Sequence, residues 1–87
     1  MIVTFYTRAH CLLCDKAKAA MELAVRRHGI EIELREVDID GDPELRARFT
    51  NDVPVIYIGG REAFRHRVNA EAFAAAVREA NGRAAVE

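Results

Sequence analysis

The sequence lacks any long apolar segment. None of its hydrophobic runs approaches the roughly 20 residues that a membrane-spanning helix needs, and residues 1–7 have neither the basic start nor the apolar stretch of a secretory signal peptide. We therefore expect no membrane partner and a cytoplasmic protein.

An excess of one charge is also absent. The chain has 13 Lys and Arg residues against 14 Asp and Glu residues, a formal net charge of -1. This balance gives no bulk electrostatic reason to bind nucleic acid, and we expect no nucleic-acid partner.

Proline and glycine are scarce, with two and five residues, while 51% of the 87 residues are hydrophobic. This composition excludes fibrous and disordered chains, and the length suits one compact domain. We expect a single domain over residues 1–81, a frayed tail over residues 82–87, and a monomer.

Only two cysteines are present, Cys11 and Cys14. In a reducing compartment such a pair does not usually persist as a structural disulfide, so it indicates redox chemistry, metal binding or two small buried core residues. A zinc site wants four ligands, but there is no second Cys-x-x-Cys, and His28 and His66 are far along the chain. We expect no metal site.

Hydrophobic periodicity and turn residues predict the order of the elements. Gly29 ends the long first helix, Asp42 and Pro43 begin the second, and Gly59 and Gly60 form the turn of a hairpin. Apolar residues in the second strand change parity after residue 34, which indicates a bulge or a strand that changes environment, and an edge strand would tolerate such a change. The predicted strands cover residues 2–7, 30–39, 53–58 and 62–68, and the predicted helices cover residues 11–28, 43–49 and 69–81.

The order strand, helix, strand, helix, hairpin, helix predicts the α/β class. Right-handed crossovers make the first two strands parallel, and the hairpin adds antiparallel neighbours. We expect a four-stranded mixed sheet flanked by three helices.

The two cysteines lie where the first strand gives way to the first helix. Amides at a helix start and the positive end of its dipole stabilise an anion, so Cys11 is expected to accept hydrogen bonds from the amides of Leu13 and Cys14. The pKa of the Cys11 thiol should then fall below the free value of about 8.5. Cys14 lies one turn further in, so Cys11 is the predicted nucleophile and Cys14 the resolving thiol.

Arg8 and His10 stand beside the pair and would add positive charge to it. The alternative is that both belong to a solvated loop.

Residues 6–14, the triplet Asp52-Val53-Pro54 and the pair Gly59-Gly60 resemble the glutaredoxin pattern within the thioredoxin superfamily. The likeness covers residues 1 to about 80. Within the family, the sequence most resembles a small bacterial-type subgroup. It implies the thioredoxin fold, βαβαββα, with strand order 2-1-3-4. It also implies that Pro54 is cis and faces the active site, and that the backbone of Val53 pairs with a substrate segment. From the sequence alone a trans proline opening a strand stays open, since about 5 to 6% of X-Pro bonds are cis.

The resemblance also bears on glutathione. Arg8 sits where the family often has a lysine and would hold a glycyl carboxylate. Leu12 and Leu13 replace the usual Pro-Tyr, and Asp52 replaces a threonine with a charge that would repel an anionic tripeptide. Glutathione is therefore a possible co-substrate, with no tightly bound cofactor.

The start of the last helix allows two interpretations. Asn69 either caps the helix, or the amides of Ala70 and Glu71 receive a ligand carboxylate.

Other charged positions are interpreted as solvated faces. This interpretation applies to Arg46, Arg48, Arg61, Arg65 and Arg67. His66 lies between apolar neighbours, and we expect it to be partly buried and structural.

The expected function is thiol-disulfide exchange on protein disulfides or glutathione mixed disulfides. Electrons would come from glutathione or from a thioredoxin-type reductase. The candidate substrate contacts are Arg8, His10, Leu12, Val53, Pro54, Asn69 and Ala70. The alternatives are an iron-sulfur or metal carrier that uses Cys11, and a redox-sensing adaptor without turnover.

Overall fold

Strands and helices alternate along the chain in the predicted order. The structure, a computed structural model, describes residues 1–86. Its elements are β1 (Ile2–Thr7), α1 (Leu12–His28), β2 (Glu33–Asp38), the 3-10 turn η1 (Ile39–Gly41), α2 (Pro43–Phe49), β3 (Val55–Ile58), β4 (Arg61–Arg65) and α3 (Ala70–Val86).

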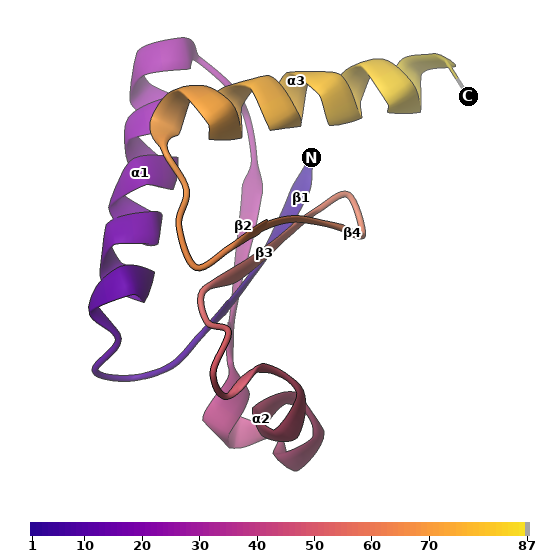
Figure 1. Cartoon of the computed structure of the whole chain (residues 1–87). Coiled ribbons are helices and arrows are strands. Elements are labelled where there is room, and N and C mark those ends of the chain that lie inside the picture. The colour runs from indigo at the N-terminus through magenta and orange to yellow at the C-terminus, as the bar shows by residue number, and fades with distance from the viewer. Residues whose placement is uncertain (87) are drawn as a thin grey trace.

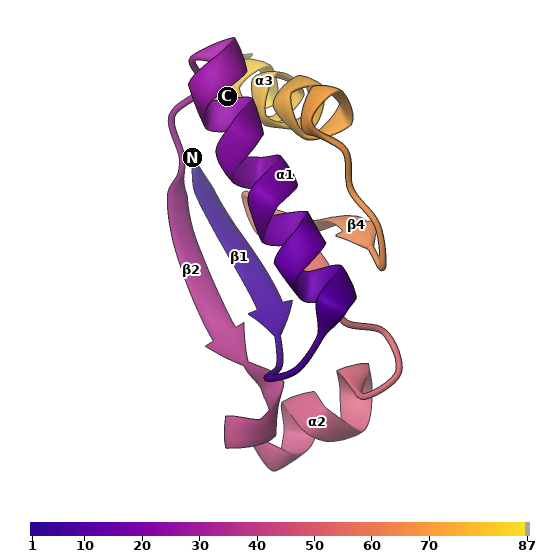
Figure 2. The same ribbon diagram turned by 90° about the vertical axis from the view of Figure 1, so that its left-hand side faces the viewer.

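The strands form one mixed sheet in the order β2-β1-β3-β4. β1 pairs with β2 in parallel and with β3 antiparallel, and β3 and β4 form the hairpin. Helices α1 and α3 lie against each other, and α2 lies apart from both, at the end where β1 and β2 finish (Figures 1 and 2). The predicted thioredoxin fold is confirmed.

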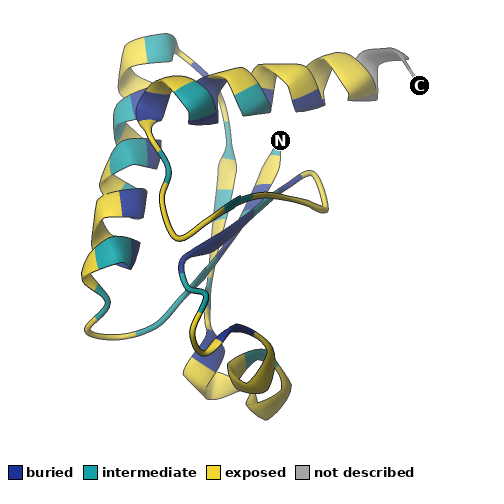
Figure 3. Cartoon of the chain, in the orientation of Figure 1, coloured by how far each residue is buried: buried dark blue, intermediate teal, exposed yellow. Residues whose placement is uncertain are grey.

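The main hydrophobic core lies between the sheet and the α1–α3 layer. Alternation along β1 places Val3 and Phe5 in this core, and helical spacing places one side of α1 and one side of α3 against them. Figure 3 shows these buried positions on the sides of the two helices that face the sheet. The core members at most 3% exposed are Val3, Phe5, Cys14, Ala17, Met21, Ala24, Ile56, Ile58, Phe73, Ala74 and Val77.

A smaller core lies under α2. Phe49 packs with Ile39 and Val55, and its ring centroid is 4.9 Å from that of Tyr6. Neighbouring residues of β1 therefore pack into different cores, Phe5 into the main core and Tyr6 into the smaller one. The smaller core holds α2 against the end of the sheet where β1 leads toward Cys11.

The second strand begins later than predicted. β2 starts at Glu33, and its pairing with β1 runs without interruption from Ile2↔Glu33 to Thr7↔Asp38. Ile30, only 8% exposed, joins the main core from the loop that follows Gly29. The change of apolar parity thus marks a loop residue recruited into the core, and β2 is an edge strand without a bulge. The register irregularity lies instead between Ile56 and Tyr57 in the β3–β4 pair.

The last strand and the last helix also differ from the prediction. β4 ends at Arg65 rather than near Val68, because His66 takes a positive φ of 71° that leaves the strand. α3 continues through Gly82 to Val86, so the expected end of the helix at Gly82 is wrong. A glycine inside a helix lowers helix stability by only about 1 kcal/mol relative to alanine, which is too little to end the helix. The rest of the predicted tail, Glu87, lies outside the described residues.

Candidate active site at the start of α1

Cys11 caps the first helix with its own sulfur. Its backbone is extended (φ -110°, ψ 103°), and the Cys14 amide donates a hydrogen bond to Cys11 Sγ at 3.1 Å. Of the two amides predicted to contact this sulfur, that of Cys14 makes the bond. The two cysteines are joined in a disulfide with Cα atoms 5.1 Å apart, so the helix spacing brings the sulfurs together as predicted.

The two sulfurs occupy different environments. Cys14 is 2% exposed and belongs to the main core, whereas Cys11 is only half-buried at the edge of that core. Leu12, between them, is 68% exposed. Cys11 is therefore accessible from outside the protein, and Cys14 is not.

The Val53-Pro54 peptide bond is cis, as the resemblance implies. Tyr6 pairs with Val55 across β1 and β3, so the chain leaves β1 toward Cys11 beside the point where it enters β3 from Pro54. Pro54 is buried, and its carbonyl accepts a hydrogen bond of 2.8 Å from the His66 amide. Three segments therefore meet at one end of the sheet: residues 8–14, 51–54 and 66–69. Pairing of the Val53 backbone with a substrate stays a prediction.

All three guanidinium nitrogens of Arg8 donate hydrogen bonds within its own chain. Its Nε donates to Asp40 Oδ2 at 3.1 Å and its Nη2 to Asp40 Oδ1 at 2.6 Å. Its Nη1 donates to the Thr50 carbonyl at 2.9 Å and to Thr50 Oγ1 at 3.3 Å. Arg8 is therefore held by an ion pair and not in a freely solvated loop, while its effect on the cysteine pair and its binding of a glycyl carboxylate stay predictions. A ligand carboxylate that bridges Nε and Nη2 of Arg8 would have to displace Asp40.

The charge of Asp52 is paired. Asp52 Oδ2 lies 3.0 Å from Arg65 Nη1, and Asp52 Oδ1 lies 3.4 Å from His66 Nε2. Arg65 also binds Glu62, with Nη2 2.7 Å from Oε1, and this hydrogen bond lowers the pKa of the Glu62 carboxyl. The prediction for His66 is wrong, because 49% of its side chain is exposed. Arg65 is exposed, but it is an ion-pair partner rather than an isolated solvated charge.

Comparison with known proteins identifies the family of this chain. Residues 2–78 match the family model described as a glutaredoxin-like domain. The chain belongs to this family.

Two of the similar proteins are named NrdH. The glutaredoxin-like protein NrdH of Salmonella typhimurium is 38% identical over 61 residues, which cover 68% of this chain and 70% of that protein. The structure of the glutaredoxin-like NrdH-redoxin of Escherichia coli, a protein with a thioredoxin-like activity profile, is 30% identical, with a TM-score of 0.56, and covers 77% of this chain and 86% of that one. The alignments span about two thirds of the length of the curated relatives.

A solved structural-genomics target from X. campestris is also similar. It has a TM-score of 0.73 and 31% identity, and it covers 88% of this chain and 96% of that one. This glutaredoxin-like domain thus has the fold of the thioredoxin superfamily and a redox Cys-x-x-Cys pair.

The other positions predicted to bind a ligand differ in exposure and backbone conformation. His10 is exposed, in the left-handed region (φ 57°) directly before Cys11, where a non-glycine residue is uncommon. Asn69 caps α3, since its Oδ1 accepts from the Ala72 amide at 2.8 Å, and the cap interpretation is confirmed. Ala70 is 5% exposed. Ligand binding by His10, Leu12, Asn69 or Ala70 stays a prediction.

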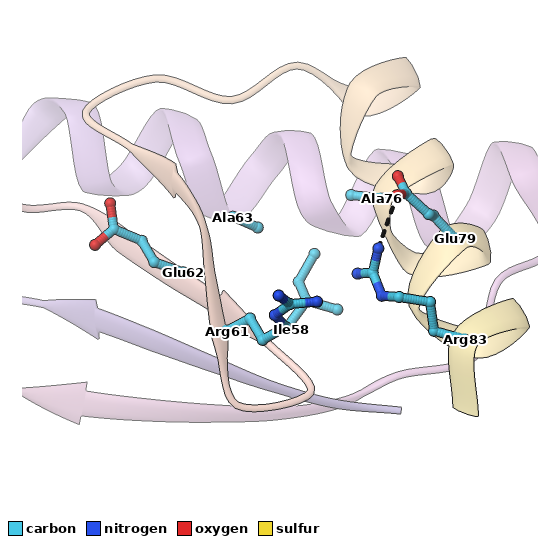
Figure 4. Close-up of a pocket in the computed structure, with 7 residues that line it drawn as sticks. All are labelled: Ile58, Arg61, Glu62, Ala63, Ala76, Glu79 and Arg83. Atoms are coloured by element: carbon cyan, nitrogen blue, oxygen red, sulfur yellow. Dashed lines mark hydrogen bonds and ion pairs between the residues drawn. The ribbon is translucent and has the colours of Figure 1, made fainter. Parts of the chain in front are cut away.

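A cleft lies away from the cysteines. It has a volume of about 420 Å³ and lies between the hairpin and α3 (Figure 4). The hairpin turn contacts the start of β1, because the Gly59 amide donates to the Ile2 carbonyl at 3.0 Å, whereas Cys11 follows the end of β1. This cleft is therefore not part of the redox site. Its lining consists of Ile58, Arg61, Glu62, Ala63, Ala76, Glu79 and Arg83.

Within residues 1–86, no three His, Cys, Asp or Glu residues are grouped so that they could hold a metal ion. Across the same part of the chain, no helix has the length and apolar character needed to cross a membrane.

Proposed function

We propose that this glutaredoxin-like domain is a thiol-disulfide oxidoreductase that reduces protein disulfides with electrons from a thioredoxin-type reductase. The observation that carries the proposal is the asymmetry of the pair. Cys11 is reachable and bonded to a helix amide, while Cys14 is sealed in the core.

The chemistry follows from this asymmetry. A hydrogen bond to the ionised form of a thiol lowers its pKa, so the Cys14 amide favours a thiolate at Cys11 in the reduced protein. That thiolate attacks one sulfur of a substrate disulfide and forms a mixed disulfide, and the first substrate thiol leaves. The Cys14 thiol loses its proton and attacks Cys11 Sγ, and the second substrate thiol leaves. The protein is left as the Cys11–Cys14 disulfide, having given up two electrons.

Two observations favour a reductase over glutathione as the electron donor. The Arg8 guanidinium, which would hold the glycyl carboxylate of glutathione, is occupied by Asp40 and Thr50. No aromatic side chain stands between the cysteines, where the chain has Leu12 and Leu13. The NrdH-redoxin of Escherichia coli combines a glutaredoxin-like chain with a thioredoxin-like activity profile, and we propose the same profile for this domain.

The test couples turnover to NADPH oxidation in two parallel assays, each with the same oxidised protein substrate. One assay contains thioredoxin reductase, and the other contains glutathione with glutathione reductase. We expect at least about tenfold faster turnover in the first, and loss of turnover in the Cys11→Ser variant in both. Faster turnover with glutathione would overturn the choice of donor. Absence of turnover in both assays would overturn the enzymatic proposal and favour the adaptor.

A further inference from the structure

A small basic groove runs beside the disulfide. It is a hollow of about 120 Å³ between the first turns of α1 and the β4–α3 loop. Leu13 lies between the two cysteines in sequence, and Ala17 follows Cys14 by one helical turn, so one wall of the groove continues the Cys-x-x-Cys segment. The groove is lined by Leu13, Lys16, Ala17, His66, Arg67 and Val68.

The opposite wall is tied to the proline loop. The His66 amide donates to the Pro54 carbonyl at 2.8 Å, and the Arg67 amide donates to the Arg65 carbonyl at 2.9 Å. The backbone that carries His66 and Arg67 is therefore held next to Pro54. A protein segment that presents its disulfide to Cys11 has this groove alongside it, because Leu13, which lines the groove, lies between the two cysteines in sequence.

The charge of the groove is positive. None of its six lining residues is acidic, and Lys16 and Arg67 are both exposed. Among the ion pairs within the described part of the chain, none includes Lys16 or Arg67. Asp52, which lies nearby, is already paired with Arg65 and His66. The acid in the first turn of α1 is Asp15. Since the whole chain has a net charge of -1, this excess of cations is local.

We propose that the basic groove binds an acidic segment that flanks the disulfide of a protein substrate. The proposal rests on the function proposed above and adds the substrate class. Complementary charge at an exposed rim raises the rate of productive encounter and disfavours like-charged partners. The advantage must then be lost at high salt, because exposed charges are screened.

The experiment measures single-turnover reduction of three disulfide-linked peptides of equal length by the pre-reduced protein. The residues that flank the peptide cysteine are two glutamates, two glutamines or two lysines. A reductase is not needed, because the reduced Cys11–Cys14 pair itself supplies the two electrons. At low salt we expect a second-order rate constant at least about fivefold higher for the acidic peptide than for the basic one. At about 0.5 M NaCl we expect the ratio to approach one.

Charge-reversal variants locate the effect. Lys16→Glu combined with Arg67→Glu should invert the preference, and the Lys16→Gln and Arg67→Gln pair should abolish it. The matched control is Arg61→Glu with Arg83→Glu, which makes the same change in net charge at the cleft of Figure 4. That cleft is separated from Cys11 by the length of β1, about 20 Å. The control should keep the ratio of the unmodified protein, and thermal unfolding of all variants confirms that they fold.

The outcomes separate this inference from the proposed function. Equal rates for the three peptides, or the same loss of preference in the control pair, would overturn the acidic docking site and leave the oxidoreductase proposal standing. Reduction of none of the peptides would overturn both.

Discussion

Arg8 and Asp40 form a two-pronged ion pair across 32 residues of sequence, with Nε–Oδ2 and Nη2–Oδ1 distances of 3.1 and 2.6 Å. The third nitrogen of the same guanidinium donates to the carbonyl of Thr50, two residues before Asp52. One side chain thus joins the segment that leads to Cys11 to the segment that leads to Pro54. Both segments line the site. Their relative position therefore depends on the contacts that Arg8 makes with Asp40 and Thr50.

Replacement of Arg8 by lysine should therefore act on stability first. A lysine has a single ammonium and cannot bridge both Asp40 oxygens and the Thr50 carbonyl at once. The pair is partly exposed, with 28% and 37% of the two side chains accessible, so we expect a loss of about 1 kcal/mol in the free energy of unfolding. Urea denaturation measures it, and a double-mutant cycle with Asp40→Asn assigns it to the pair. Unchanged stability together with a raised KM for a glutathione mixed disulfide would instead make Arg8 a ligand-binding residue.

Replacement of Asp52 by threonine should raise activity on glutathione mixed disulfides. The change removes a negative charge at the proline loop and releases Arg65 from one of its two acidic partners. Attraction of an anionic tripeptide should then increase severalfold at low salt. Steady-state kinetics with the glutathione-coupled assay measures the change.

The matched control is Glu31→Gln, which removes one negative charge from an exposed position in the loop after α1. The same gain in both variants would show a general effect of net charge and contradict a local role for Asp52.

Replacement of Glu62 by glutamine should destabilise the protein only above acidic pH. The hydrogen bond from Arg65 lowers the pKa of the Glu62 carboxyl in the folded state. A lowered folded-state pKa contributes stability that is present above the unfolded-state pKa of about 4.3 and is lost as the pH falls through the folded-state pKa. The midpoints of urea unfolding for the two proteins should therefore differ slightly at neutral pH and converge below about pH 4. A difference that persists at low pH would rule out the ion pair as its source.

Serine and alanine replacements should distinguish the environments of the two cysteines under reducing conditions. At position 14 serine should be less stable than alanine by about 1 to 3 kcal/mol, because it buries a hydroxyl in an apolar core. At position 11 the order should reverse by about 0.5 to 2 kcal/mol, because serine is a good helix cap and alanine is not. Thermal unfolding of the four variants checks both orders. The same order at both positions would contradict the assignment of one capping and one core cysteine.

Local sequence patterns predicted the parts of this fold that depend on local interactions. The hairpin turn at Gly59 and Gly60, with φ values of 59° and 83°, and the cap at Asn69 follow directly from residue types. The start of α1 next to Cys11 follows from the same kind of pattern.

The features that local patterns missed depend on tertiary contacts. The partner of Arg8 lies 32 residues away, and no local pattern marks Asp40 for that role. Ile30 belongs to the core although it lies in a loop, which made β2 look longer than it is. The positive φ of His66 turns an apolar-flanked histidine outward, so hydrophobic neighbours in sequence misrepresented its exposure.

Trapping of the mixed disulfide tests the central claim most directly. A disulfide-linked peptide is mixed with the reduced Cys14→Ser and Cys11→Ser variants, and intact-mass spectrometry records the adducts. The account predicts that Cys14→Ser accumulates one peptide, bound through Cys11 and released by dithiothreitol, whereas Cys11→Ser accumulates none. Adduct formation at Cys14 in the Cys11→Ser variant, or no adduct in either variant, would contradict it.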